Sequence, residues 1–251
     1  MKISVITITY NSQFTVEDTI KSVLSQDYPD VEYIIVDGLS KDKTMEVVNQ
    51  YRNRISKIVS EKDKGLYDAL NKGIGLATGD IVGMLHSDDI YADDHVLSRI
   101  AEEFKQHSNI QAVYGDLVFV NRADTQKIMR TWTAGAYNED AFLQGWMPPH
   151  PTFYIKKECY DKYGVFNTSL KLSADYELML RMIHKNKVKV RYIPQTLVKM
   201  RMGGVSNVSF FVKLKANLED KLAWKLNDIK PGKLTLLKKP LHKLSQYFKR
   251  K

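Results

Sequence analysis

The sequence has a single cysteine, Cys159, so it cannot form an internal disulfide bond. A lone thiol is typical of proteins that work in a reducing compartment. The sequence also has no run of the roughly 18 apolar residues that a membrane-spanning helix needs. Its first apolar stretch, residues 3–8, is too short for a signal peptide and ends before Tyr10. These absences predict a cytoplasmic protein.

A basic charge bias is missing from most of the chain. Residues 1–208 contain 26 Lys and Arg and 26 Asp and Glu, so they carry no net charge. Residues 209–251 contain 12 Lys and Arg against 3 Asp and Glu, and they hold the whole net charge of +9. A globular part without basic bias gives no support to nucleic-acid binding, so we expect no nucleic-acid partner. A basic tail suits an anionic membrane surface or an acidic partner.

The chain has 251 residues and is 43% hydrophobic, which is enough for one sizeable core. Strands and helices alternate in its first third. We predict strands at 3–8, 31–36, 55–60 and 80–85, with helices at 14–25, 44–51 and 66–77 between them. Such alternation favours an α/β fold with a mostly parallel central sheet flanked by helices.

The pattern changes after residue 91. We predict helices at 94–107 and 174–184, a long loop at 133–151, and strands at 112–120, 127–132, 152–155 and 188–193. Long loops inside compact domains are often functional. The chain therefore divides into a domain at 1–208 and a basic, amphipathic, helical tail at 209–251.

Polar residues cluster where the predicted strands of the first third end. The clusters are residues 9–12, 37–42, 61–65 and 86–89. In parallel α/β sheets, ligands bind beyond the carboxyl ends of the strands. Four polar clusters at one rim therefore predict a ligand site there.

Asp88 and Asp89 directly follow the predicted strand at 80–85. Two adjacent carboxylates repel each other, and a divalent cation relieves that repulsion. Carboxylates suit the hard ions Mg²⁺ and Mn²⁺, which can neutralise charge on a departing diphosphate. Taken alone, the pair fits the start of the helix at 94–107 equally well.

Three further residues have both a functional and a structural interpretation. Asp37 ends a strand beside Gly38, where it could hydrogen bond a base or a ribose, although ordinary loop chemistry explains it better in isolation. Asp175 opens a helix and could act as a general base, or only stabilise the helix dipole. His150 lies between two prolines and fits a ligand contact or a structural histidine.

Taken together, the motifs resemble family 2 glycosyltransferases of the Rossmann-like GT-A fold, and among them the WfgS-like group tied to O-antigen and capsule synthesis. The resemblance spans about residues 1–207. The blocks that carry it are Ser4–Asn11, Ser25-Gln26 with Tyr28-Pro29, Glu32–Gly38 with Ser40 and Asp42, Glu61–Gly73, Ala77–Asp80, Ser87–Asp89, Pro149–Thr152, Asp175–Leu178 with Arg181, and Gly203–Ser206.

The resemblance implies inverting transfer of a sugar from a nucleoside diphosphate donor, a UDP-sugar foremost, to a glycan or lipid-linked oligosaccharide in surface polysaccharide synthesis. It implies Asp175 as catalytic base and Asp89, with Asp88, as ligands of Mn²⁺ or Mg²⁺. Trp146, His150, Arg201 and Ser206 become acceptor or diphosphate contacts. The implied donor nucleotide contacts are Thr7, Thr9, Tyr10, Asn11, Asp37, Gly38, Ser40, Asp63, Lys64, Asn71, His86, Ser87 and Asp88.

The sequence departs from the family pattern at three positions. Gly38 stands where many members have a second acidic residue, which puts base recognition by that position in doubt. Ser87 stands where the metal motif often has another carboxylate. Ala174 precedes Asp175, where the pattern has glutamate, so Asp175 must transfer the proton without an acidic neighbour.

Two other functions fit parts of the pattern. A sugar nucleotidyltransferase would also use a Rossmann-like sheet and acidic metal ligands, but its glycine-rich, basic phosphate loop is missing from residues 9–12. A non-catalytic nucleotide- or glycan-binding module is disfavoured by the three carboxylates Asp88, Asp89 and Asp175.

The tail has two amphipathic segments. The first carries Phe210, Phe211, Leu214, Leu218, Leu222 and Leu226 among lysines, and the second carries leucines between 234 and 244. Basic amphipathic helices lie in a membrane interface, which would place the protein peripherally on the inner face of the cytoplasmic membrane. A helix that packs on the domain or drives self-association fits the same pattern.

Overall fold

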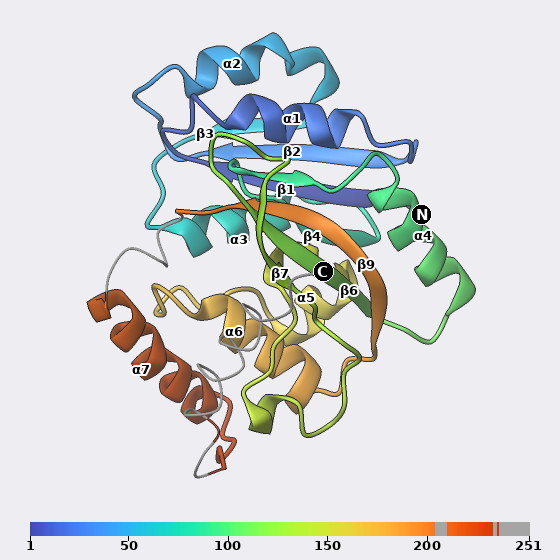
Figure 1. Ribbon diagram of the computed structural model, residues 1–251, viewed down its shortest axis with the longest axis vertical. Coiled ribbons are helices and arrows are strands. Elements are labelled where there is room, and N and C mark those ends of the chain that lie inside the picture. Colours follow the sequence, from blue (N-terminus) through green and yellow to red (C-terminus); the bar gives the residue numbers. More distant parts are fainter. Residues whose placement is uncertain (204–209, 233–234, 236–251) are drawn as a thin grey trace.

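The computed structural model describes residues 1–203, 210–232 and 235, and its first third alternates strands and helices as predicted (Figure 1). Every predicted element of this part is present. They are β1 (Ile3–Thr9), α1 (Val16–Leu24), β2 (Val31–Asp37), α2 (Thr44–Gln50), β3 (Lys57–Ser60), α3 (Leu66–Leu76) and β4 (Ile81–Met84).

The second part of the chain contains two elements that the sequence pattern missed. They are the strand β5 (Asp89–Tyr91) and the helix α5 (Lys157–Tyr163). A strand of three residues is too short to show periodicity, and β5 forms because it pairs with β9. The predicted elements here are α4 (Val96–Gln106), β6 (Ala112–Val120), β7 (Ile128–Trp132), β8 (Tyr154–Lys156), α6 (Ala174–Met179), continued by a π-helical turn (Leu180–Lys185), and β9 (Val190–Arg201).

The nine strands of the described residues form one sheet in the order β3-β2-β1-β4-β8-β6-β9-β5, with β7 paired to β6. The pairs among β1 to β4 are parallel, and β6 also runs parallel to β9. β8 is antiparallel to both β4 and β6. The predicted mostly parallel sheet is therefore confirmed for the first third, and an antiparallel strand joins it to the rest.

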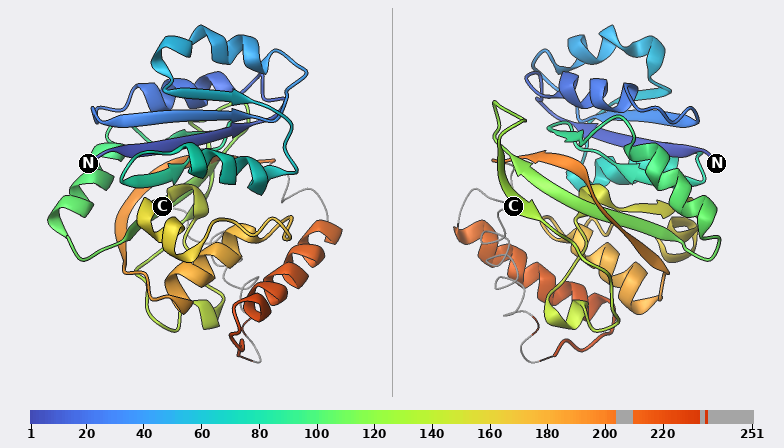
Figure 2. Two further views of the ribbon diagram at one scale, coloured as in Figure 1. Left: turned by 180° about the vertical axis from the view of Figure 1, so that it is seen from behind. Right: turned by 45° about the vertical axis from the view of Figure 1, so that its right-hand side comes forward.

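Helices cover both faces of the sheet (Figures 1 and 2). Every residue of β1 is buried, and alternate side chains point to opposite faces. Ile3 and Val5 belong to the core beneath α1, α2 and α4, whereas Ile6 and Ile8 belong to the core beneath α3 and α6. The continuous apolar run of β1 is thus explained by burial on both sides.

The loops that follow β1 and β2 are hydrogen bonded to each other. Ser40 Oγ accepts from Asn11 N at 2.9 Å, and Asn11 Oδ1 accepts from Lys41 N at 2.9 Å. Thr44 Oγ1 accepts from Ser12 N at 2.7 Å. These bonds hold the carboxyl-end rim of the sheet as one connected surface.

The other end of the sheet is held by Glu32, a buried carboxylate. It accepts from Ser4 Oγ at 2.6 Å and from Thr78 N at 2.7 Å, and it pairs with Lys57 at 2.9 Å. Burial alone would raise the pKa of Glu32, but these hydrogen bonds outweigh it and lower the pKa to about 2. Glu32 therefore joins β1, β2 and the turn before β4.

The helix α7 (Phe210–Leu226) packs on α6 through its inward face. Trp224 is fully buried and donates from Nε1 to the hydroxyl of Tyr176 at 3.0 Å. Glu219 Oε2 accepts from the backbone N–H groups of Lys171, Leu172 and Ser173 at 3.0, 2.7 and 3.1 Å. The first half of the segment 209–251 therefore has close contacts with the domain at 1–208.

The outward face of α7 is apolar. Leu218, Leu222 and Leu226 are 63%, 41% and 44% exposed, and Lys221 and Lys225 are exposed near them. None of the helices within the described ranges is both long and apolar enough to cross a bilayer. The second predicted tail helix, except Thr235, lies outside the described residues.

Candidate active site

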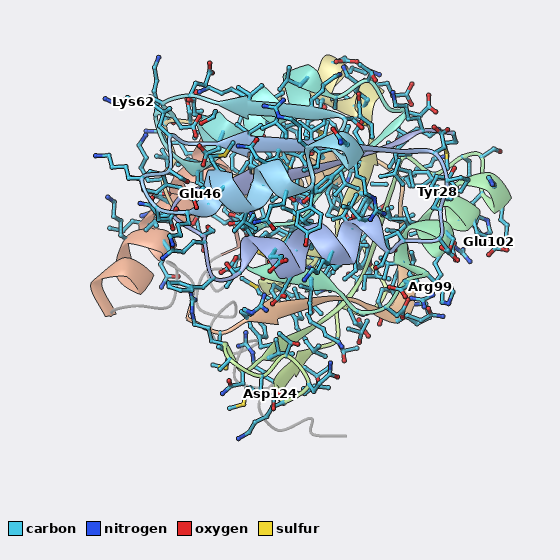
Figure 3. All side chains as sticks on the ribbon, turned by 90° about the horizontal axis from the view of Figure 1, so that it is seen from above. Tyr28, Glu46, Lys62, Arg99, Glu102 and Asp124 are labelled. Atoms are coloured by element: carbon cyan, nitrogen blue, oxygen red, sulfur yellow. The ribbon has the colours of Figure 1, made fainter. Side chains whose placement is uncertain are left out.

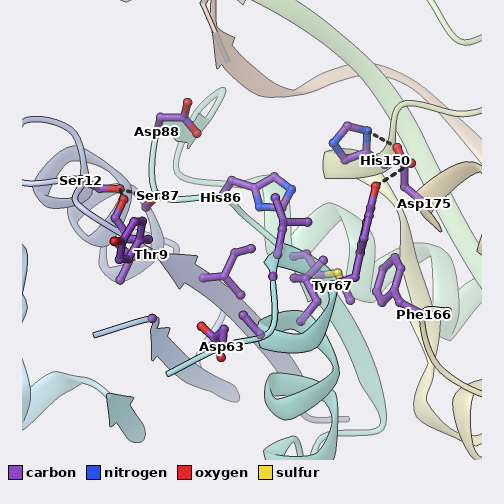
Figure 4. Close-up of a pocket in the computed structure, with 18 of the residues that line it drawn as sticks. Thr9, Ser12, Asp63, Tyr67, His86, Ser87, Asp88, His150, Phe166 and Asp175 are labelled. Atoms are coloured by element: carbon purple, nitrogen blue, oxygen red, sulfur yellow. Dashed lines mark hydrogen bonds and ion pairs between the residues drawn. The ribbon is translucent and has the colours of Figure 1, made fainter. Parts of the chain in front are cut away.

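A cavity of about 740 Å³ opens at the carboxyl-end rim of the sheet (Figure 4). The turn after β1, the segment 62–67 and the turn after β4 form one part of its wall, and His150 and Asp175 close it from the second half of the chain. The structure thus brings together ten of the predicted site residues. Those in the wall are Thr9, Tyr10, Asn11, Gly38, Asp63, His86, Ser87, Asp88, His150 and Asp175.

Asp88 and Asp89 have different surroundings. Asp88 is in the cavity wall, whereas Asp89 lies behind it with no exposed surface. Burial raises the pKa of both carboxyls, and Asp88 raises that of Asp89 further. Both carboxylate oxygens of Asp89 lack a hydrogen-bond partner within the described part of the chain.

A divalent cation fits this pair of carboxylates. A buried carboxylate without a partner is costly, and a bound cation removes that cost. The described residues contain no group of three or more His, Cys, Asp or Glu side chains that could hold a metal alone. A site with one or two carboxylates that is completed by substrate phosphates is the usual arrangement for Mg²⁺.

Asp175 has contacts with two neighbours at another part of the wall. Its Oδ1 accepts from the Tyr67 hydroxyl at 3.2 Å, and its Oδ2 lies 3.3 Å from His150 Nδ1 (Figure 4). The loop before Asp175 is the one whose N–H groups bind Glu219. The carboxylate is therefore oriented from α3, from the segment at 150 and, through its own loop, from α7.

His86 lies between Asp88 and Asp175 in the view of Figure 4. Its ring is centred 5.7 Å from that of His150. Burial, with a contribution from His150, lowers the pKa of His86 to about 4. His86 is thus uncharged at neutral pH and does not repel a cation at the neighbouring aspartates.

The departure from the family pattern at Gly38 has a structural counterpart. A Cβ atom at position 38 would lie only 2.9 Å from Asp63 Oδ2. Asp63 is held there by Lys72, whose Nζ lies 2.6 Å from Oδ1. The carboxylate of Asp63 therefore occupies the space beside residue 38 that a larger side chain would need.

Several predicted nucleotide contacts lie outside the cavity wall. The Thr7 hydroxyl is buried and accepts from Tyr33 at 3.1 Å. Asp37 accepts from Ser40 N at 3.1 Å and from Ser60 Oγ at 2.6 Å, so Asp37 and Ser40 shape the loop from within. Lys64 is exposed, and its backbone N–H binds Asp68.

Four more predicted residues also lie away from the wall or outside the described part. The Asn71 amide donates to the carbonyl oxygen of Phe166 and accepts from its N–H, both at 2.9 Å. Trp146 lies in an aromatic cluster and donates from its ring N–H to Ala134 O at 2.7 Å. Arg201 is 4% exposed and donates to Asp18, and to Asp88 O at 3.0 Å. Ser206 lies outside the described residues.

Three functional candidates in the wall were missed by the sequence interpretation. Arg122 lies beside Asp88, and its charge lowers the pKa of that carboxyl against the effect of burial. Lys62 is the second cationic side chain of the wall, and Tyr67 binds Asp175. Arg122 follows the predicted strand at 112–120, so the rule that ligands bind at strand ends could have identified it.

The chain is similar to known glycosyltransferases over most of its length. Residues 4–171 match the family described as Glycosyl transferase family 2. A PGL/p-HBAD biosynthesis glycosyltransferase of Mycobacterium bovis is 26% identical over 208 residues, which are 81% of this chain and 78% of that protein. A poly-beta-1,6-N-acetyl-D-glucosamine synthase of Staphylococcus epidermidis is 38% identical over 79% of this chain and 49% of that protein.

Solved structures share the fold. TarS of S. aureus, residues 1–349 in complex with UDP-GlcNAc, superimposes with a TM-score of 0.70 and 18% identity, over 98% of this chain and 73% of that one. The mannosyltransferase PcManGT of Pyrobaculum calidifontis, in complex with GDP-Man and Mn²⁺, superimposes with a TM-score of 0.67 and 20% identity, over 98% of this chain and 70% of that one. The predicted GT-A fold is thereby confirmed.

Proposed function

Since the chain belongs to glycosyl transferase family 2 and is a glycosyltransferase, we propose that it moves a sugar from a nucleoside diphosphate donor to an acceptor hydroxyl, with inversion at the anomeric carbon. One observation supports this most directly. A single cavity has Asp88 in one wall, with the unpartnered carboxylate of Asp89 buried behind it, and the oriented carboxylate of Asp175 in another part of the wall. Direct displacement needs a leaving-group site and a base on opposite sides of the sugar.

The donor nucleoside occupies the part of the cavity near β1 and the segment at 62–67. Thr9 supports this, because its buried Oγ1 has no partner among the described residues. The Asp63 carboxylate accepts an N–H of the base, in place of the acidic side chain that Gly38 lacks. A UDP-sugar is the donor we propose, in line with the UDP-GlcNAc bound to TarS.

The diphosphate lies against Asp88, Arg122 and Lys62. A Mn²⁺ or Mg²⁺ ion held by Asp89 and Asp88 would neutralise charge on the departing diphosphate. Arg122 and Lys62 supply further positive charge from the protein itself. Preorganised charges of this kind stabilise the transition state more than the ground state.

Asp175 takes the proton of the acceptor hydroxyl. The hydroxyl oxygen then bonds to the anomeric carbon while the bond from that carbon to the diphosphate oxygen breaks. Tyr67 and His150 position the carboxylate, and the hydrogen bond donated by Tyr67 does not remove its capacity to accept a proton. No acidic neighbour is required, which fits Ala174 at the preceding position.

The acceptor we propose is a glycan or lipid-linked oligosaccharide of surface polysaccharide synthesis. The name of the S. epidermidis relative, a synthase of an N-acetylglucosamine polymer, supports this class. The basic segment 209–251 then holds the protein at the inner face of the cytoplasmic membrane. The exposed leucines and lysines of α7 are consistent with that role.

Calorimetric donor binding tests the site. We expect one UDP-sugar to bind in the presence of Mn²⁺, more tightly than GDP- and dTDP-sugars, and to lose affinity in the Asp89→Ala variant. Asp161→Ala, at a carboxylate that is 64% exposed and is not part of the cavity wall, is the matched control. If Asp89→Ala still binds the donor with unchanged dependence on Mn²⁺, Asp89 is not a ligand of the cation. Proton NMR of the product reports whether the anomeric configuration is inverted.

A further inference from the structure

The rim around the cavity mouth exposes apolar side chains that the proposed reaction does not use. Two of them lie on the loops after β1 and β2, which hydrogen bonds join, and the third is the first residue of α3. Phe14 is 88% exposed, Leu39 is 49% exposed and Leu66 is 47% exposed. Leu66 also lines the cavity, and Phe14 and Leu39 are next in sequence to Thr15 and Gly38, which line it.

Leu39 is held in an unfavourable backbone conformation. Its φ angle is 59°, in the left-handed region that favours glycine, and its side chain is nonetheless large and half exposed. A glycine at this position would remove the strain and the exposed apolar surface together. A strained, exposed leucine is explained if the side chain has a binding role.

Exposed lysines surround these apolar residues. These lysines are Lys41, Lys43, Lys62 and Lys64. None of their ammonium groups forms an ion pair with a side chain that the structure describes. The carboxylates of the same loops are engaged elsewhere. Asp42 accepts from Gln13 N and Thr44 N, and Lys72 pairs with Glu61 and Asp63. The rim therefore presents lysine ammonium groups that pair with none of the carboxylates that the structure describes.

We propose that this rim, defined as Phe14, Leu39 and Leu66 with Lys41, Lys43 and Lys64 around them, docks on an anionic lipid bilayer. Lysines attract anionic headgroups, and exposed aromatic and aliphatic side chains insert among them. Lys62 lies at the same end of the molecule as α7, opposite to Tyr28 (Figure 3). Docking by the rim would therefore turn the cavity mouth toward the membrane, and it adds a second contact to the one proposed for the tail.

Sedimentation with vesicles tests the rim in the full chain, without donor or acceptor. Vesicles of phosphatidylglycerol and phosphatidylcholine in equal amounts should bind the protein, less so as salt rises, and pure phosphatidylcholine should bind it weakly. The double variant Phe14→Ser, Leu39→Gly should partition at least about tenfold less. Lys41→Ser with Lys43→Ser should also weaken binding about tenfold at low salt.

The controls separate docking from folding. Lys127→Ser with Ile128→Ser removes one exposed lysine and one exposed apolar side chain from β7 and its turn, and should partition like the wild type. Leu39→Gly should keep or raise the thermal midpoint, because it relieves a positive φ. Wild-type partitioning by the Phe14 and Leu39 variant, or no preference of the wild type for the anionic vesicles, would overturn the proposal.

Membrane docking by the rim rests on the proposed function only in that it would bring the active site to a lipid-linked acceptor. Docking and sugar transfer are measured separately, so either can be contradicted without the other. Nucleoside diphosphate release from the donor is measured on the same preparations without vesicles. A protein that docks but releases none contradicts the transfer and leaves the docking intact.

Discussion

His150 Nδ1 lies 3.3 Å from Asp175 Oδ2, and the Tyr67 hydroxyl lies 3.2 Å from the other oxygen of the same carboxylate. These two contacts come from parts of the chain that are distant in sequence. Together they fix Asp175 in the cavity wall without the acidic neighbour that the family pattern places before it. The contacts lead to the first prediction.

Asp175→Asn should lower turnover by about 10²–10⁴-fold, because a positioned proton acceptor is worth that much. Asparagine keeps the size of the side chain and can still accept from Tyr67, so donor affinity should survive. Steady-state turnover and calorimetric donor binding measure the two effects. Turnover like that of the wild type would assign the proton transfer to another group.

Glu219→Ala should lower kcat more than it changes the donor KM. The variant leaves the N–H groups of Lys171, Leu172 and Ser173 without their acceptor, so the loop before Asp175 is released. A small misplacement of a reacting group costs about ten- to a hundredfold in rate. Asp228→Asn, beyond the end of α7 with a side chain that is 90% exposed, is the control, because asparagine tolerates the φ of 58° at this position. A loss of stability without any change in kcat would make Glu219 purely structural.

Glu32→Gln should destabilise the protein at neutral pH but not in strong acid. The folded state lowers the pKa of Glu32 from 4.5 to about 2, so its contribution is complete above pH 4.5 and is lost as pH falls toward 2. The difference in unfolding free energy should be roughly 2–3 kcal/mol at pH 7. Denaturant unfolding at several pH values measures it, with the exposed Glu46→Gln as control. A difference that does not shrink in acid would contradict the prediction.

Two glycines of α3 should respond to alanine in opposite ways. A Cβ at Gly73 would overlap the Cγ2 methyl of the buried Ile6, whereas a Cβ at Gly75 meets nothing within 4 Å. Gly73→Ala should cost about 1–3 kcal/mol through overpacking. Gly75→Ala should gain about 0.5–1 kcal/mol, because alanine favours the helix. Thermal unfolding of the Gly73→Ala and Gly75→Ala variants tests whether α3 packs this closely on β1. Equal changes in stability for the two variants would mean that it does not.

The sequence predicted most of the first third of the fold. Its strands are continuous apolar runs and its helices have apolar residues at helical spacing, and both are local signals. The pattern failed for β5, whose strand character comes from pairing with β9, far along the chain. It also could not show that α7 turns Leu218, Leu222 and Leu226 outward and buries Trp224, because tertiary contacts decide which face of a helix is covered.

The same division holds for the site. Residues that follow a strand directly, such as Thr9, Gly38 and Asp88, reached the cavity wall as predicted, because parallel strands end at one rim. Arg122 follows β6 and reaches the same wall by the same rule, whereas Tyr67 comes from α3 and reaches it only through the packing of that helix. Asp88 lies in the turn before β5, whereas Asp89 is the first residue of β5 and is buried where that strand pairs with β9.

The sequence by itself determined the family, the order of strands and helices in the first third, and the rim on which polar residues gather. Those features depend on neighbours in the chain, where hydrophobic spacing and strand ends can be read directly. The tertiary structure alone decided which carboxylates face the cavity, that Asp63 fills the space beside Gly38, and that α7 supports the loop before Asp175. These depend on side-chain directions and on pairs of residues that only folding brings within hydrogen-bonding distance.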